Sequence, residues 1–206
     1  MSENKNSELE VKFYVRDLAA VERKLQLLGA QLTAGRVFEI NLRFDTPDGR
    51  LGRGMQALRL RQDTRARLTY KGPSSFTSGA RLRTEIEFEA SDFAAAQAFL
   101  EALGFQVAMG YEKYRTTYQL GPVEVVLDEL PYGNFVEIEG PDPAAIRAAC
   151  NTLGLRWDAA AGGSYVALFE ALKQRRGLDF RDLSFENFHG LQVSAQDLGV
   201  SLAAEG

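Results

Sequence analysis

The sequence predicts an α+β fold, a closed eight-stranded antiparallel β-barrel with helices packed outside. Two observations predict it. About eight segments alternate between apolar and charged or polar residues, as strands with two different faces do. Three of them carry a glutamate pair and precede a predicted helix that ends at Leu-Gly; the pairs are Glu8 with Glu10, Glu85 with Glu87, and Glu137 with Glu139. Helices between strands should cover the apolar face, which leaves the charged face inside the barrel.

The strands are predicted from this alternation. We expect them at residues 8–15, 31–45, 57–62, 67–71, 81–89, 111–120, 123–130 and 134–139. The alternation is longest over residues 81–89, where arginines and glutamates share one face and apolar residues the other. Gly72-Pro73-Ser74-Ser75 predicts that the preceding strand ends at Lys71 and that a flexible loop runs to about Gly79.

Four helices are predicted from apolar residues at helical spacing. We expect them at about residues 17–29, 91–103, 142–154 and 164–175. Asp17 and Ser91 are suited to N-caps, and Pro143 is suited to a first helical turn. We divide the chain into one domain, residues 1–176, and a C-terminal tail, residues 177–206, that packs on the domain through its aromatic residues and frays from about Ala203.

Composition excludes several classes of protein. The formal net charge of -4 gives no basic balance for binding nucleic acid. Cys150 is the single cysteine, so no disulfide can form within the chain, which fits a reducing compartment. No apolar run reaches the roughly 20 residues of a membrane helix, and residues 1–7 lack the apolar region of a signal peptide. We therefore expect a cytoplasmic protein with no membrane and no nucleic-acid partner.

The charged face carries both signs. The acids are Glu8, Glu10, Glu85, Glu87, Asp128, Glu137 and Glu139, and the bases are Lys12, Arg59, Arg61, Lys71, Arg83, Lys113 and Arg115. Carboxylates at this density suit a hard cation, Mg²⁺ or Mn²⁺, and the bases suit a phosphate-rich anion. A single such pattern usually marks a solvated outer face with cross-strand ion pairs. Its repetition on most strands, opposite an apolar face that helices must cover, favours a charged cavity.

Other catalytic motifs are weak or missing in the sequence. No GxxxxGK[ST] phosphate loop occurs, and the single histidine, His189, lies in the tail, where we expect it to pack. A zinc site and a Ser/His/Asp set are therefore not expected. Attack by water or by a substrate hydroxyl is favoured over a nucleophilic side chain.

These residues resemble the CYTH superfamily, the triphosphate tunnel metalloenzymes. Glu8-Leu9-Glu10-Val11-Lys12 is similar to the N-terminal ExExK signature of that superfamily, and its companions follow in the expected order over residues 7–172. They are Leu58-Arg59-Leu60-Arg61, Thr69-Tyr70-Lys71-Gly72-Pro73, Arg83-Thr84-Glu85-Ile86-Glu87, Lys113-Tyr114-Arg115, Leu127-Asp128, Phe135-Val136-Glu137-Ile138-Glu139 and Gly163-Ser164-Tyr165. The tail lies outside the resemblance.

The resemblance implies an eight-stranded tunnel that binds a triphosphate with Mg²⁺ or Mn²⁺. Carried over position by position, the metal ligands would be Glu8, Glu10, Asp128, Glu137 and Glu139. The phosphate-binding residues would be Lys12, Arg59, Arg61, Lys71, Arg83, Lys113 and Arg115. Lys71, Glu85 and Glu87 would lie closest to the chemistry, with the two glutamates serving a second metal or the reacting water.

The resemblance leaves the reaction open. We expect a metal-dependent triphosphatase that acts on tripolyphosphate or a nucleoside triphosphate such as ATP. The alternatives are a class IV adenylate cyclase and a module that binds polyphosphate or nucleotide without turnover. Leu68 to Pro73 looks like the cyclase branch, whereas Phe44-Asp45-Thr46-Pro47-Asp48 looks like the phosphatase type. Arg43 stands where thiamine triphosphatases have a tyrosine beside the catalytic lysine, which disfavours that activity. A homodimer is compatible with the sequence.

Overall fold

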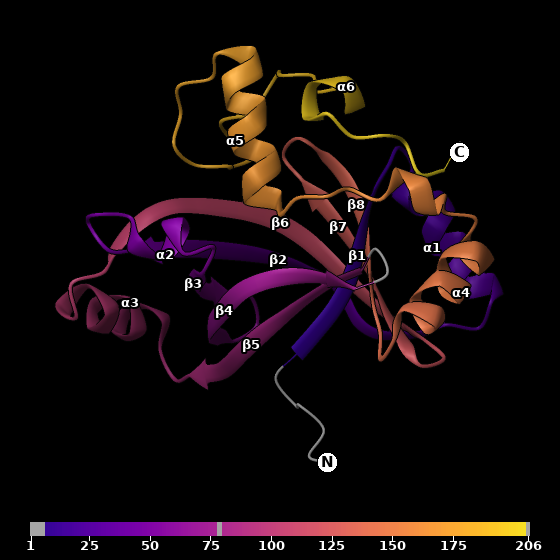
Figure 1. The fold of residues 1–206 in the computed structure, drawn as a ribbon, viewed down its shortest axis with the longest axis horizontal. Helices are drawn as coiled ribbons and strands as arrows, with labels where there is room; N and C mark the ends of the chain where they lie inside the picture. Colours follow the sequence, from indigo (N-terminus) through magenta and orange to yellow (C-terminus); the bar gives the residue numbers. More distant parts are fainter. Residues whose placement is uncertain (1–6, 78–79, 205–206) are drawn as a thin grey trace.

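Eight antiparallel strands form one sheet that closes on itself as a ring (Figure 1). The computed structural model describes residues 7–77 and 80–204, and the side chains of residues 9–75 and 82–204. The strands are β1 (Ser7–Val15), β2 (Gln31–Asp45), β3 (Ala57–Gln62), β4 (Ala66–Thr77), β5 (Ala80–Ala90), β6 (Gln106–Leu120), β7 (Val123–Leu130) and β8 (Gly133–Glu139). Their order around the ring is β1-β5-β4-β3-β2-β6-β7-β8. The expected closed antiparallel sheet of eight strands is present.

Helices lie on the outer side of the ring, as expected. They are α1 (Leu18–Leu27), α2 (Arg50–Arg53), α3 (Phe93–Ala102), α4 (Pro143–Leu153), α5 (Tyr165–Arg176) and α6 (Ala195–Leu198), with a 3₁₀ turn at Trp157–Ala159. Phe13 of β1 and Ile138 of β8 are fully buried in one apolar cluster with Leu25 of α1 and Ile146 of α4. Because side chains alternate along a strand, this outward apolar face turns the charged residues of β1 and β8 to the inside.

A second apolar cluster covers β2 and β3. Leu100 of α3 packs with Phe44 and Leu60 there. The N-cap of α3 is Asp92, and the sequence-based choice of Ser91 is wrong. The Asp92 carboxylate accepts a hydrogen bond from the Ala95 backbone N–H at 2.6 Å, which satisfies one of the free donors at the start of the helix.

Strand β4 does not end at Lys71, so the predicted flexible loop after it is wrong as far as Thr77. The pairing with β5 shifts register between Lys71 and Ser74 and then continues. Pro73 lies inside this irregularity, where the absence of an N–H breaks no ladder bond. Residues 78–79 of the expected loop lie outside the described residues.

The C-terminal part of the chain packs with α5 on the end of the ring that holds the turn between β7 and β8 (Figure 1). Phe135 of β8 meets Tyr165 of α5 at 5.1 Å between ring centroids, and Leu183 and Phe188 of the tail belong to the same cluster. Phe180 and Phe188 of the tail pack against Phe169 of α5. The expected fraying from Ala203 is wrong, because this residue is fully buried and its N–H donates to the Tyr14 carbonyl.

Candidate active site inside the ring

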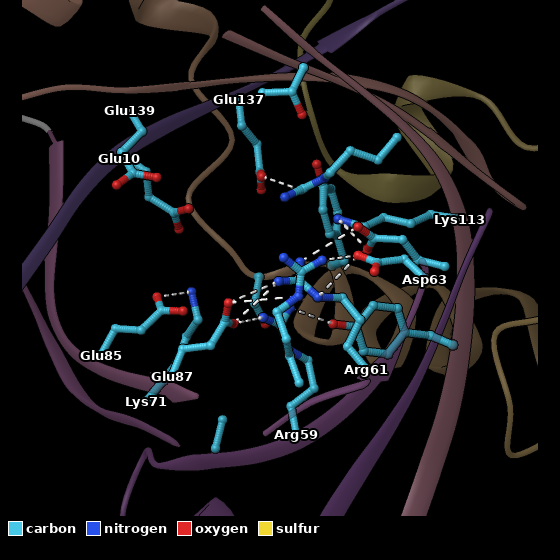
Figure 2. A pocket seen from close by; sticks show the side chains of 18 of the residues that line it. Glu10, Arg59, Arg61, Asp63, Lys71, Glu85, Glu87, Lys113, Glu137 and Glu139 are labelled. Carbon is cyan, nitrogen blue, oxygen red and sulfur yellow. Dashed lines mark hydrogen bonds and ion pairs between the residues drawn. The ribbon is translucent and has the colours of Figure 1, made fainter. Parts of the chain in front are cut away.

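A cavity of about 680 Å³ lies inside the ring, and all eight strands contribute side chains to its wall (Figure 2). This volume is within the range of small-molecule sites. Residues expected at the site that line it are Glu10, Lys12, Arg59, Arg61, Lys71, Arg83, Glu85, Glu87, Lys113, Arg115, Glu137 and Glu139. The side chain of Glu8 lies outside the described residues. Asp128 is fully buried and does not line the cavity.

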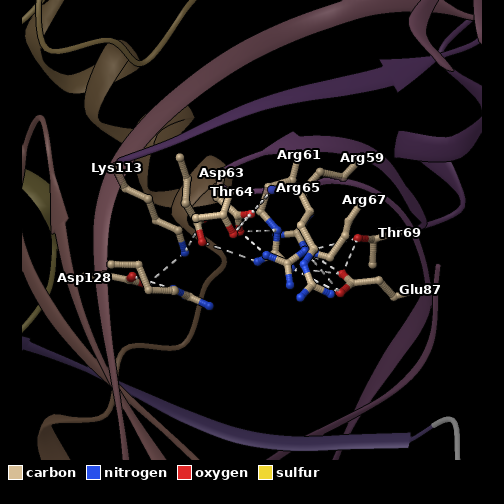
Figure 3. Close-up of polar contacts among 12 residues, drawn as sticks. Arg59, Arg61, Asp63, Thr64, Arg65, Arg67, Thr69, Glu87, Lys113 and Asp128 are labelled. Atoms are coloured by element: carbon tan, nitrogen blue, oxygen red, sulfur yellow. Dashed lines mark hydrogen bonds and ion pairs between the residues drawn. The ribbon is translucent and has the colours of Figure 1, made fainter. Parts of the chain in front are cut away.

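Arginines of β3 and β4 converge on Glu87 of β5 (Figure 3). Arg61 donates to both carboxylate oxygens of Glu87 at 3.2 Å, Thr69 donates at 2.7 Å, and Arg59 lies at 3.5 Å. Burial would raise the pKa of Glu87, but the Thr69 hydroxyl and the arginines outweigh it and lower that pKa. Glu87 is therefore a weak base that holds two guanidinium groups in the cavity wall.

Lys71 and Glu85 form the second contact between β4 and β5. The Lys71 Nζ lies 2.5 Å from Glu85 Oε2, and both side chains line the cavity (Figure 2). Arg83, two residues before Glu85 and on the same face, donates from Nε to the Gly72 carbonyl at 2.6 Å. The register shift after Lys71 therefore gives Arg83 a backbone acceptor beside the cavity.

The wall formed by β1, β8 and β7 is acidic. Glu139 of β8 has an acidic Cα partner on both sides, Glu10 of β1 and Glu124 of β7. Glu137 lies on the same face and forms ion pairs with Lys12 and Arg115. Like charges directly opposite one another destabilise a sheet unless a cation lies between them.

The acidic wall fits a divalent ion. Glu10, Glu137 and Glu139 offer oxygen donors of the type that Mg²⁺ and Mn²⁺ prefer. Among the described side chains, those of residues 9–75 and 82–204, no three Asp, Glu, His or Cys groups form a ready metal-binding cluster. The donors would therefore share the ion with water and phosphate oxygens, as Mg²⁺ sites commonly do.

Asp128 organises the cations at the back of the cavity. Arg115 donates to both of its oxygens at 2.7 and 2.5 Å, Lys113 donates at 3.1 Å, and the Tyr165 hydroxyl donates at 2.8 Å. Burial would raise the pKa of Asp128, but Arg115 and Lys113 outweigh it and lower that pKa strongly. Asp128 thus positions two phosphate-binding candidates, Arg115 and Lys113, and the metal-ligand role that the resemblance implies for it stays a prediction.

Several lining residues were not among the predicted site residues. Glu39 and Arg43 of β2 face the cavity, as do Tyr111 of β6 and Tyr165 of α5. Polar residues on alternate positions of residues 39–43 could have revealed the first two, and Tyr111 shares its parity with Lys113. Tyr165 is the first residue of a helix and shows no such alternation, so its one signal is the resemblance of Gly163-Ser164-Tyr165.

The comparison with family models decides the identity. The CYTH domain model matches residues 6–148. The chain belongs to the CYTH domain family. A comparison with curated proteins found no match.

Solved structures with a similar fold support this assignment. A candidate adenylate cyclase from Vibrio parahaemolyticus gives a TM-score of 0.73 at 20% identity, over 81% of this CYTH chain and 99% of that one. The PH1819 protein of Pyrococcus horikoshii gives 0.68 at 25% identity, over 79% and 98%. A candidate adenylyl cyclase from Hippeastrum, described with a dominant triphosphatase activity, gives 0.61 at 20% identity, over 79% and 95%. At these identities the likeness shows a shared fold. None of the helices in the described part of this CYTH protein is long and apolar enough to cross a membrane.

Proposed function

We propose that this CYTH protein is a divalent-metal-dependent enzyme that hydrolyses a phosphoanhydride bond of a triphosphate, either inorganic or carried by a nucleoside. The main support for this proposal is the arrangement of charges in one cavity. A single cavity has an acidic wall around Glu139 and faces it with the guanidinium and ammonium groups of the other strands. A triphosphate with a bound cation satisfies both walls at once, because the phosphates take the bases and the cation takes the carboxylates.

Arginine and lysine side chains would bind the phosphates. Arg59 and Arg61 present planar guanidinium groups that can grip a phosphate with two parallel hydrogen bonds, and Lys12, Arg83, Lys113 and Arg115 add positive charge from the other strands. Arg83 is held by backbone carbonyls, and the other groups are held by carboxylate partners. They can therefore stabilise the charge that develops on the transferred phosphoryl group with little reorganisation.

Mg²⁺ or Mn²⁺ held by Glu10, Glu137 and Glu139, together with Glu8, would neutralise phosphate charge and lower the pKa of a bound water. We assign the orientation of the reacting water to Glu85 and Lys71, which form an ion pair within the cavity. Glu87 fixes Arg59 and Arg61 instead, since its lowered pKa makes it a weak proton acceptor. Asp128 positions Arg115 and Lys113.

A class IV adenylate cyclase is the second candidate. It is favoured by the sequence Leu68-Thr69-Tyr70-Lys71-Gly72-Pro73. The similar Vibrio parahaemolyticus structure is also named as a candidate adenylate cyclase. In that reaction the ribose 3′-hydroxyl of ATP would attack in place of water. The triphosphatase activity described for the Hippeastrum structure favours hydrolysis. A module that only binds polyphosphate is the third candidate, although it would have little use for an acidic wall. The cytoplasmic location and a homodimer stay predictions.

Product analysis separates the three candidates. The protein is incubated with Mg²⁺ or Mn²⁺ and either tripolyphosphate or ATP, and the products are resolved by ion-exchange chromatography. Release of orthophosphate supports the hydrolase. Cyclic AMP with pyrophosphate supports the cyclase. Saturable binding without turnover supports the binding module, and neither binding nor turnover contradicts all three.

A further inference from the structure

Two arginines lie side by side in the cavity wall, on the neighbouring strands β2 and β3. Arg43 and Arg59 are direct Cα partners, and both line the cavity. Arg59 has acceptors on three sides, from Thr69, Glu87 and the Tyr111 hydroxyl. Arg43 has no hydrogen bond and no ion pair with any residue that the structure describes, and its buried Nε has no acceptor there. Like charges placed opposite each other destabilise a sheet, so an anion bound between these two arginines would be stabilising.

No carboxylate of the described residues forms an ion pair with Arg43, although Asp45 and Tyr111 act on it electrostatically. Asp45, two residues further along β2, accepts hydrogen bonds from the backbone N–H groups of Thr46, Leu51 and Gly52 at 2.7 to 2.9 Å. Burial lowers the pKa of Arg43 and the facing Arg59 adds to this, while Tyr111 and Asp45 offset only part of the effect. A guanidinium group remains protonated even so, and its charge needs compensation.

Further polar groups without partners lie beside Arg43. Asn41 is on the same face of β2 and fully buried, and neither its Nδ2 nor its Oδ1 has a hydrogen-bond partner within the described residues. Its Cα partner on β6 is Tyr111, whose pKa is lowered by Arg59, Lys113 and Arg43 even though burial would raise it. Buried polar groups in folded proteins nearly always have partners, so a cluster of unsatisfied ones is consistent with a ligand site.

We propose that Arg43, with Arg59 and Tyr111, binds the terminal phosphoryl group of the substrate. The proposal rests on the proposed function. Met109, the Cα partner of Arg43, and Tyr111 both belong to the apolar cluster that packs on this end of the ring. We therefore place the end of the phosphate chain, rather than an internal phosphate, at this site. A terminal phosphoryl group carries up to two negative charges and matches two guanidinium groups, whereas an internal phosphate carries one.

This assignment restricts the substrate class. Linear polyphosphates and nucleoside triphosphates have a free terminal phosphoryl group and fit the subsite. A triphosphate that is esterified at both ends, such as diadenosine triphosphate, has none. We expect such a compound to bind more weakly than tripolyphosphate, with an affinity that does not depend on Arg43.

Titration calorimetry with tripolyphosphate, in Mg²⁺ and in EDTA, tests the subsite. Arg43→Gln should raise the Kd about tenfold or more, because a charge-assisted hydrogen bond is lost. Arg36→Gln is the matched control, since this arginine of the same strand is half exposed and pairs with Glu129 outside the cavity. We expect it to change the Kd less than twofold. Equal binding by wild type and Arg43→Gln overturns the subsite alone. Failure of the wild type to bind tripolyphosphate under both conditions overturns the proposed function as well.

Thermal unfolding separates a binding role from a structural one. Without phosphate compounds, Arg43→Gln should have a Tm equal to or above that of the wild type, because the mutation removes an uncompensated buried charge. Its Tm increase on adding tripolyphosphate should be smaller than that of the wild type. Arg43→Lys keeps a charge but loses the planar fork, and should bind with intermediate affinity. A Tm several degrees below wild type with unchanged tripolyphosphate affinity would show that Arg43 is structural and would overturn the proposal.

Discussion

The Nη2 atom of Arg115 lies 2.5 Å from Asp128 Oδ2 and 2.7 Å from Glu137 Oε2. One guanidinium group thus joins a fully buried carboxylate of β7 to a carboxylate of β8 in the acidic wall. Asp128 fixes the cation, and the cation in turn orients Glu137. Arg115 therefore links the acidic and basic walls of the cavity. A substitution at Asp128 should change the position of Arg115 and of Glu137 at the substrate site.

Replacement of Asp128 tests this connection. Asp128→Asn keeps the shape of the side chain but leaves Arg115 and Lys113 buried against a neutral amide. We expect a loss of about 3 kcal/mol in the free energy of unfolding, as for other broken buried ion pairs. Urea denaturation measures it. Glu129→Gln is the matched control at the next residue, where an exposed pair with Arg36 should contribute less than about 1 kcal/mol. Equal stability of the two variants would contradict the connecting role of Asp128.

Glu39 predicts a pH dependence of stability. Its side chain is 2% exposed and lies 3.5 Å from both Lys113 and Arg61. Burial would raise its pKa, but Lys113, Arg115 and Arg61 outweigh it and lower the pKa from 4.5 to about 2. The carboxylate therefore stabilises the folded state above pH 4.5, and this contribution is lost as the pH falls from there to about 2.

The experiment for Glu39 compares unfolding free energies of wild type and Glu39→Gln between pH 7 and pH 2. The variant should be less stable at neutral pH, and the difference from wild type should shrink as the pH falls. A difference in unfolding free energy that stays constant through this range would show that protonation of Glu39 does not cause the pH dependence of stability.

The acidic wall predicts which substitutions remove metal dependence. Glu10→Gln and Glu139→Gln keep the side-chain shape and remove one charge from a pair of facing carboxylates. Each should abolish Mg²⁺- or Mn²⁺-dependent turnover while the protein stays folded by circular dichroism. Glu129→Gln, on the outer face of β7, should leave turnover unchanged. Full activity in both wall variants would mean that the metal assignment is wrong.

The tail predicts a stability effect far from the acidic wall. Leu183 is fully buried, and its backbone bonds to Gly110 and Glu112 of β6. Leu183→Ala should cost about 3 kcal/mol of unfolding free energy, because it leaves a cavity in the cluster that packs on the end of the ring. Leu191→Ala, at a tail residue that is 39% exposed, should change stability by about 0.5 kcal/mol or less. Similar values for the two variants would contradict a stabilising role of the tail at this end of the ring.

Residue alternation predicted the strands and their faces, because the two faces of each strand meet different surroundings. It therefore predicted that Glu10, Lys71, Arg115 and Glu137 face one cavity, and all four line it. Alternation does not give the register between strands that are distant in sequence. That register pairs Glu139 with both Glu10 and Glu124, and it sets Arg43 opposite Arg59.

Local signals also failed where tertiary contacts decide the conformation. Gly72 and Pro73 are typical of a loop, yet the following residues continue β4 because β5 offers them a partner. Ala203 lies near the end of the chain and would be expected to fray. It is held instead by hydrogen bonds to Tyr14 and Arg156, which no local pattern near Ala203 indicates.

A crystal structure with tripolyphosphate and Mn²⁺ would show directly where substrate and metal bind, since the anomalous signal of manganese locates the ion. We expect manganese at the acidic wall, bound by Glu10 and Glu139. We expect the phosphates between that wall and Arg59 and Arg61, with the terminal group at Arg43. Phosphate or manganese bound only on the outer surface of the ring, with the cavity unchanged, would contradict this arrangement.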